Sequence, residues 1–276
     1  MKRSFSPPSY APILLAALVG CAFELPPEDE FLDTRCEWWI PLTDAQRDFP
    51  IAAVLPMTGQ IGKPDDDALA RTRAMQLAIE GANERQGIGG RKFGFRVCNK
   101  GFGWVSGGAI KAAHIGRWLA DQGTQTIITG GSNDTLAIHA ATSAKKSLIM
   151  SLGATAADIT HLTDSDLVWR VAPSDLYQGV VMAKVLADQG AKNVAVVAID
   201  NAYGESLGKV LKDNAGAMTV KVYPARRSLS DAAPLLQLIV DQAPDFLVFA
   251  TDPSVAKKVL DTMNAKGSLA NVPLLL

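Results

Sequence analysis

Short apolar runs alternate with single helical segments from residue 50 to the end of the chain. Strands that are apolar throughout, with one helix between each pair, are typical of parallel sheets covered on both faces. The sequence therefore predicts an α/β fold. The predicted strands are 51–55, 93–97, 125–129, 147–151, 168–171, 193–199, 218–224, 245–250 and 272–276. The main predicted helices are 66–85, 133–145, 175–189, 204–215, 231–242 and 253–266.

One polar interval, AADITHLTDSDL at 156–167, interrupts this alternation. We interpret Val171-Ala172-Pro173 as a crossing between two halves of the chain. The sequence thus predicts two Rossmann-like lobes with parallel sheets, an amino-terminal lobe at 49–172 and a carboxyl-terminal lobe at 173–276.

The first twenty residues have the pattern of a secretory signal. A basic start is followed by the apolar run APILLAALVG, which is too short to span a bilayer. We therefore assign residues 1–20 as a signal peptide. The run ends in Leu18-Val19-Gly20-Cys21, which resembles the bacterial lipoprotein cleavage box and implies a lipid on the Cys21 sulfur. The alternative is an ordinary signal with a chance cysteine. Ala22 after the cysteine favours the outer membrane.

Residues 21–48 have paired prolines, several acids and no sustained period, so we interpret them as an acidic tether. Trp38 and Trp39 are expected to dock its end onto the fold. Cys36 and Cys98 form an even pair that an oxidising compartment would allow to bridge; the alternative is two separate buried thiols. Neither cysteine has metal-site spacing and the three histidines are scattered, so no metal or other cofactor is expected.

Charge and motifs exclude several classes of function. The formal net charge is −1 and no basic stripe is present, which argues against nucleic acid as a partner. The glycine clusters lack dinucleotide-binding spacing. No nucleophile elbow, Ser/His/Asp set or paired carboxylates stand out, so no catalytic residue is assigned and an enzyme is not expected.

Small and hydroxylated residues follow three predicted strands of the first half. Ligands of open parallel sheets bind beyond the carboxyl ends of the strands. A serine at a helix start, with free N–H groups behind it, suits an anion such as a carboxylate. Taken singly, Ser132 could be only a helix cap and Gly153 only a tight turn. The candidate residues are Thr58, Gly131, Ser132, Gly153, Ala154 and Thr155.

Together these segments resemble the periplasmic leucine/isoleucine/valine-binding proteins, the type I solute-binding proteins of ABC transporters. The likeness runs from about Ile51 to the last residue. It is carried by Met57-Thr58-Gly59, the helix ending Gly87-Ile88-Gly89-Gly90, the loop with Ser132, the turn 151–155, DNAYGE at 200–205 and PDFLV at 244–248.

The resemblance implies a role for each matching position. Ser132 would bond a ligand carboxylate, while the Ala154 backbone and the Thr155 hydroxyl would hold the amino and carboxylate groups. Tyr203 would close over the ligand from the second lobe. Asp252, where the family often has an aromatic residue, is either a counter-charge to an ammonium or the cap of the helix that begins at Pro253.

The resemblance also implies a function and its partners. We expect a lipid-anchored periplasmic protein that captures a small amino-acid-like solute for ABC permease subunits. The alternative is an outer-membrane lipoprotein of the same fold that regulates a cell-wall enzyme, or acts as a sensor, through protein contacts. Family members continue beyond the strand that ends this chain, so the second lobe is expected to be incomplete.

Overall fold

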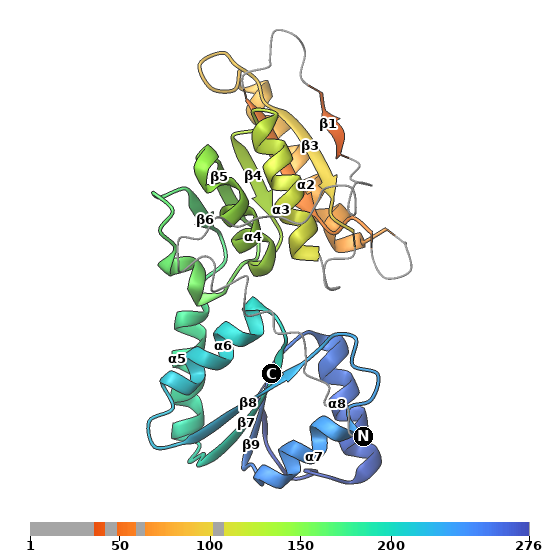
Figure 1. The fold of residues 1–276 in the computed structure, drawn as a ribbon, viewed down its shortest axis with the longest axis vertical. Coiled ribbons are helices and arrows are strands. Elements are labelled where there is room, and N and C mark those ends of the chain that lie inside the picture. Colours follow the sequence, from red (N-terminus) through yellow and green to blue (C-terminus); the bar gives the residue numbers. More distant parts are fainter. Residues whose placement is uncertain (1–35, 42–48, 59–63, 102–107, 276) are drawn as a thin grey trace, which may run out of the picture.

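The computed structural model describes residues 36–41, 49–58, 64–101 and 108–275. The predicted signal, Cys21 and most of the predicted tether lie outside these ranges. Two lobes are stacked along the longest axis, each with one sheet and helices against it (Figure 1). This architecture confirms the predicted α/β fold with two parallel-stranded lobes.

The first lobe is built on a six-stranded sheet of order β1-β3-β2-β4-β5-β6. All neighbours are parallel except β1 and β3, which are antiparallel. The strands are β1 (Cys36–Ile40), β2 (Pro50–Leu55), β3 (Gly94–Asn99), β4 (Thr126–Thr129), β5 (Leu148–Ser151) and β6 (Val168–Arg170).

Alternate residues of β2 serve the two faces of this sheet, because successive side chains of a strand point to opposite sides. Ala52 and Val54 pack with the helices α3 (Gly108–Asp121) and α4 (Ser132–Thr142). Ala53 and Leu55 pack with α2 (Asp66–Glu84) on the other face. Asp65 begins α2 by accepting a hydrogen bond from the Ala68 N–H. The predicted helix 133–145 divides into α4 and a short 3₁₀ turn, η4 (Ser143–Lys145).

Strand β1 lies inside the segment that we predicted to be a structureless tether, so that prediction is wrong for residues 36–40. Cys36 lies directly opposite Cys98 of β3, and the two form a disulfide. Trp39 packs against the core beside α2. The guanidinium carbon of Arg96 lies 5.3 Å from the ring centre of Trp38 and 4.9 Å from the ring centre of Trp118 in α3. Burial of aromatic surface and a covalent link hold this strand on the sheet edge.

The second lobe has a four-stranded parallel sheet of order β10-β9-β7-β8. Val194, Val196 and Ala198 of β7 face the helices α5 and α6, whereas Ala195 and Val197 face α7 and α8. The strands are β7 (Asn193–Ile199), β8 (Thr219–Ala225), β9 (Phe246–Ala250) and β10 (Leu274–Leu275). The helices are α5 (Asp175–Asp188), α6 (Ala202–Asp213), α7 (Ala233–Gln242) and α8 (Pro253–Lys266).

The chain crosses between lobes after β6 and enters α5. The polar interval before β6 contains a short 3₁₀ helix, η5 (Ala157–His161). Two hydrogen bonds join the lobes beside this crossing: the Ala157 N–H donates to Ser206 Oγ at 2.7 Å, and the Ala202 N–H donates to Asn133 Oδ1 at 2.8 Å. Helix α6 of the second lobe therefore rests with its amino-terminal part on α4 and η5 of the first.

Candidate functional site

The carboxyl ends of β2, β4 and β5 bring the predicted small and hydroxylated residues to one edge of the first sheet. Strand order reverses here, because β3 and β4 lie on opposite sides of β2. Ligands of open parallel sheets bind at such a reversal point. The second lobe faces the same edge, as the two hydrogen bonds between the lobes require.

Ser132 and the 151–156 turn meet at this edge. Ser132 is the first residue of α4, and its side chain does not cap the helix, since the residue at the cap position is Gly131. The Ser132 hydroxyl oxygen instead accepts a hydrogen bond from the Ala156 N–H at 3.2 Å. Ser132 is only 6% exposed. Its hydroxyl proton is not used by the Ala156 bond, so it can be donated to a carboxylate.

Both the hydroxyl and the carbonyl of Thr155 form hydrogen bonds with Asp175, the first residue of α5. Its hydroxyl donates to Asp175 Oδ2 at 3.1 Å, and its carbonyl accepts from the Asp175 N–H at 2.8 Å. Arg170 Nη1 also donates to the carbonyls of Thr155 and Ala156, at 3.1 and 2.8 Å. Because Thr155 donates its only hydroxyl proton to Asp175, it can offer a ligand only acceptor lone pairs. An ammonium group fits that polarity.

Asp175 is a site residue that sequence reasoning missed. Its side chain is fully buried, and Oδ1 has no hydrogen-bond partner within the described part of the chain. Burial raises the pKa of Asp175 to about 6, against the opposing effects of the Thr155 hydrogen bond and the Arg170 charge. Ser174-Asp175 reads as a helix cap, and Ser174 does accept from the Leu176 N–H. The signal that could have revealed Asp175 is an acid placed directly after the lobe crossing.

Gly131, Gly153 and Ala154 shape the backbone around these hydroxyls. A Cβ at Gly153 would lie 2.9 Å from the Gly130 carbonyl oxygen, so the close approach of the β4 and β5 loops requires glycine there. A Cβ at Gly131 would meet open space, which leaves room above the start of α4. The Ala154 N–H donates to Ser151 Oγ at 3.0 Å, so a ligand would bond Ala154 through its carbonyl.

Thr58 lies farther along the same edge. Its hydroxyl accepts a hydrogen bond from Asn99 Nδ2 at 3.4 Å, which ties the loop after β2 to the end of β3. Next to it, Lys100 Nζ forms a buried ion pair with Asp134 Oδ1 at 2.7 Å. Burial raises the pKa of Asp134, although the Lys100 charge and hydrogen bond oppose the shift. The ion pair fixes the first turn of α4, and with it Ser132, against β3. Phe102 and Trp104, in the loop that follows β3, lie outside the described residues.

Tyr203 is the second residue of α6 in the second lobe. It packs against the core between α5 and α6 and is half-buried. Burial raises the pKa of Tyr203, and the nearby Asp175 charge raises it further. The pKa of Glu205 is also raised, by burial and by the charges of Asp200 and of Asp158 in the first lobe. Tyr203 and Glu205 at the start of α6 therefore lie close to the acidic groups of Asp175 and Asp158, on either side of the crossing between the lobes.

For Asp252 the structure shows the capping alternative. Its Oδ1 accepts from the N–H groups of Ser254 and Val255 at the start of α8, and its Oδ2 pairs with Arg227 Nε at 3.0 Å. Burial opposes ionisation, but the hydrogen bonds from Ser254 and Arg227 and the Arg227 charge outweigh it, so the pKa of Asp252 is lowered. A ligand ammonium would have to compete with these partners, and we omit Asp252 from the ammonium site.

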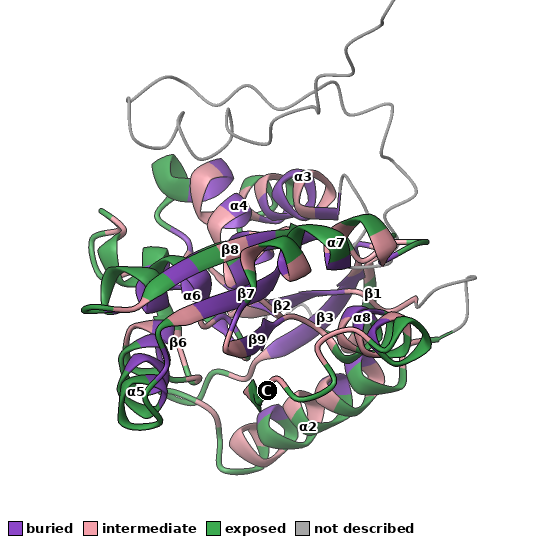
Figure 2. Cartoon of the chain, turned by 90° about the horizontal axis from the view of Figure 1, so that it is seen from below, coloured by how far each residue is buried: buried purple, intermediate pink, exposed green. Residues whose placement is uncertain are grey.

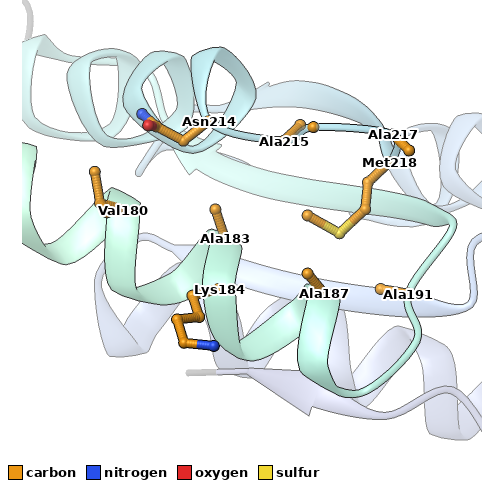
Figure 3. Close-up of a pocket in the computed structure, with 10 residues that line it drawn as sticks. Val180, Ala183, Lys184, Ala187, Ala191, Asn214, Ala215, Ala217 and Met218 are labelled. Carbon is orange, nitrogen blue, oxygen red and sulfur yellow. The ribbon is translucent and has the colours of Figure 1, made fainter.

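Two hollows of the surface are lined mainly by residues other than these polar groups. One of about 440 Å³ lies between α5 and the turn that follows α6 (Figure 3). Alanine, valine and methionine side chains make most of its wall; the polar side chains that line it are Lys184 and Asn214, and it has no acid to bind an ammonium group. A second, of about 390 Å³, is lined by α2 and by Leu152, beside the Gly153 turn.

Other kinds of site find no support in the described ranges. These residues contain no group of three histidine, cysteine or acidic side chains placed to hold a metal ion. None of the helices in the same ranges is both long enough and apolar enough to cross a bilayer.

The sequence profile described as periplasmic binding protein matches residues 48–275, which is most of the chain and all of both sheets except β1. The chain belongs to the periplasmic binding protein family. The resemblance drawn from the sequence motifs is thereby confirmed. Strand β1 and its Cys36 lie before the matched region.

The chain is also similar to individual proteins and solved structures. A chemotactic signal transduction system substrate-binding protein, BasB, of Halobacterium salinarum is 27% identical over 220 residues, covering 77% of this chain and 52% of that protein. A periplasmic binding protein of Burkholderia mallei has the same fold at a TM-score of 0.69 and 19% identity, covering 83% of this chain and 60% of the other. A substrate-binding protein of Desulfitobacterium hafniense in complex with Leu reaches 0.59 at 20% identity, covering 82% and 65%. The chain thus spans about half the length of its curated relative.

Proposed function

We propose that this member of the periplasmic binding protein family captures a small amino-acid-like solute at the lobe boundary. The Ser132 hydroxyl and the first turn of α4 would hold the carboxylate of the solute. The Thr155 lone pairs and Asp175 Oδ1 would hold its ammonium group. Tyr203 would cover the solute when the lobes close.

The observation that carries the proposal is the buried, unpartnered Oδ1 of Asp175 beside the acceptor side of Thr155. A buried acceptor without a partner costs about 1–3 kcal/mol, so such atoms are rare unless something else satisfies them. An ammonium group satisfies two acceptors at once. Ser132 Oγ lies 3.2 Å from the backbone nitrogen of Ala156, the residue after Thr155. The start of α4 at Ser132 would therefore supply the complementary donors for a carboxylate close to this ammonium site.

The family supports a periplasmic location, and the pattern of the first 21 residues supports a lipid anchor. We place the protein in the periplasm, anchored through a lipid on Cys21, with the outer membrane favoured by Ala22. It would deliver its solute to the permease subunits of an ABC transporter. Closure of the two lobes around a solute gives a permease a shape to recognise that the empty form lacks.

The test is a melting-temperature screen of the purified chain with the twenty free amino acids. At least one is expected to raise the melting temperature, by an amount that grows with the logarithm of its concentration once that exceeds the dissociation constant. Thr155→Val removes the acceptor lone pairs at nearly constant volume. Losing the proposed hydrogen bond from the solute's ammonium group to Thr155 should weaken binding of that solute by about 5- to 30-fold, corresponding to roughly 1–2 kcal/mol.

Thr219→Val is the matched control, because Thr219 is an exposed residue at the amino end of β8, the opposite end of its sheet. This variant should bind like the parent. A screen in which no amino acid shifts the melting temperature would contradict the proposal, as would equal weakening in both valine variants.

A second candidate is regulation of a cell-wall enzyme through protein contact. The outward side of α5 favours it, because Tyr177 is 73% exposed and Val181 61% exposed on one helix face (Figure 2). Contiguous exposed apolar surface is typical of interaction sites. This candidate predicts that no free amino acid stabilises the protein, so the same screen separates the two.

A further inference from the structure

The second lobe presents an ion pair, and not an apolar wall, at the reversal point of its sheet. Arg227 follows β8 and Asp252 follows β9, and their Nε and Oδ2 atoms are 3.0 Å apart. Because β7 lies between β8 and β9 in the sheet, the pair passes over the carboxyl end of β7. The reversal point of strand order in this lobe is at β7, so the ion pair lies where a bound solute would meet the second lobe.

This ion pair is built into the fold. The side chains of Arg227 and Asp252 are 20% and 10% exposed, and Asp252 also caps α8 through Ser254 and Val255. Lys258 of α8 donates to the Leu229 carbonyl at 2.8 Å and so fixes the loop that follows Arg227. An aliphatic side chain placed against this surface would strip water from two charges without replacing their hydration.

An unused hydroxyl lies beside the ion pair. Thr251, the residue between β9 and Asp252, has a buried Oγ1 with no hydrogen-bond partner within the described residues. A buried hydroxyl is usually bonded, so this one lacks a partner that a ligand could supply. A guanidinium donates only, whereas a hydroxyl can donate or accept. An oxygen acceptor is the group that both can bind.

We infer that Arg227 and Thr251 select a solute whose side chain ends in an oxygen acceptor, a carboxylate or an amide, over one with an aliphatic side chain. The inference rests on the proposed function, in which the first lobe holds the amino-acid head group. The second lobe then determines which side chain is accepted. This preference differs from that suggested by the Leu complex of the Desulfitobacterium hafniense relative.

The test is calorimetric titration of the full chain with L-glutamate, L-glutamine and L-leucine. Glutamate or glutamine is expected to bind at least tenfold more tightly than leucine. Arg227→Met keeps the length of the side chain but removes its donors, and should reverse that order. Thr251→Val should weaken glutamate or glutamine several-fold and leave leucine unchanged.

Arg226→Met is the matched control. Arg226 is the neighbouring arginine, half-exposed and paired with Asp200 at 3.1 Å, away from β9. The control should keep the parent order of the three solutes. Leucine as the tightest ligand of the parent would overturn this inference and leave the proposed function standing. An identical change of order in both methionine variants would also overturn it. Absence of binding by any amino acid would overturn the proposed function as well.

Discussion

At the scale of single residues, the polarity of the site depends on the hydrogen bonds that each hydroxyl already makes within the protein. The Thr155 hydroxyl donates a hydrogen bond to Asp175, whereas the Ser132 hydroxyl accepts one from the Ala156 N–H. Two hydroxyls that look alike in the sequence therefore face a ligand with opposite polarity. Their places were predictable, because each follows a predicted strand. Asp175 was not, because its contact with Thr155 forms only when the chain turns from the first lobe into α5.

Asp175 should make stability depend on pH in a defined direction. Its pKa in the folded protein is raised from 3.8 to about 6 by burial. Folding therefore favours the protonated form, and the cost of the ionised form is absent below about pH 4. That cost grows as the pH rises and is complete above about pH 6, reaching at most about 3 kcal/mol.

We expect the parent protein to lose more stability than Asp175→Asn when the pH is raised from 4.5 to 7.5. Urea unfolding at several pH values measures the difference. The exposed Asp241→Asn variant is the control and should follow the parent curve. Parallel curves for the parent and Asp175→Asn would show that burial does not perturb this carboxyl group.

At the scale of elements, the strands between 50 and 275 were predictable because each is a run of apolar residues. Boundaries differ by a few residues; within the described residues, the last predicted strand begins at Leu274, two residues later than expected. Strand β1 was missed because CEWWI lies in an acidic, proline-rich segment and has no period of its own. Its pairing depends on Cys98, 62 residues away, and a long-range partner leaves no local signal.

Two glycines inside helices should respond in opposite ways to alanine. A Cβ at Gly179 of α5 would lie 2.5 Å from Val210 Cγ1 and 3.1 Å from the Leu211 nitrogen of α6. Gly179→Ala should therefore force α5 away from α6 and cost about 1–3 kcal/mol of unfolding free energy. A Cβ at Gly81 of α2 would meet only the end of Arg85, at 3.6 Å.

Gly81→Ala is the matched control and should stabilise the protein by about 0.5–1 kcal/mol, the usual preference of a helix interior for alanine. Thermal unfolding of both variants measures the two effects. Destabilisation by both, or by neither, would mean that the close packing of α5 on α6 does not depend on Gly179.

At the scale of the whole molecule, the two lobes were predictable from a single interruption in the β–α alternation. The contacts between them were not, since Asn133 and Ser206 look like ordinary surface residues of their helices. In the structure each accepts a backbone N–H from the opposite lobe. Both bonds bridge the two lobes, so losing either removes a contact that holds the lobes together.

Asn133→Ala should shift the molecule toward the open arrangement. It leaves the Ala202 N–H without its acceptor, at a cost of about 1–3 kcal/mol. We expect a larger radius of gyration in small-angle scattering and, for any amino acid that binds, an affinity lowered about 5-fold or more. Asn133→Asp keeps an acceptor oxygen at the start of α6 and should behave like the parent. Equal expansion of both variants would contradict this assignment.

The disulfide between Cys36 and Cys98 determines how a mechanical force would pass through the molecule. Through this bond, the chain that precedes residue 36 is linked covalently to β3, which lies between β1 and β2 in the first sheet, and not to the crossing between the lobes. A pull on the amino terminus is carried by the first lobe alone. The second lobe then bears none of that load, because the chain enters it after β6.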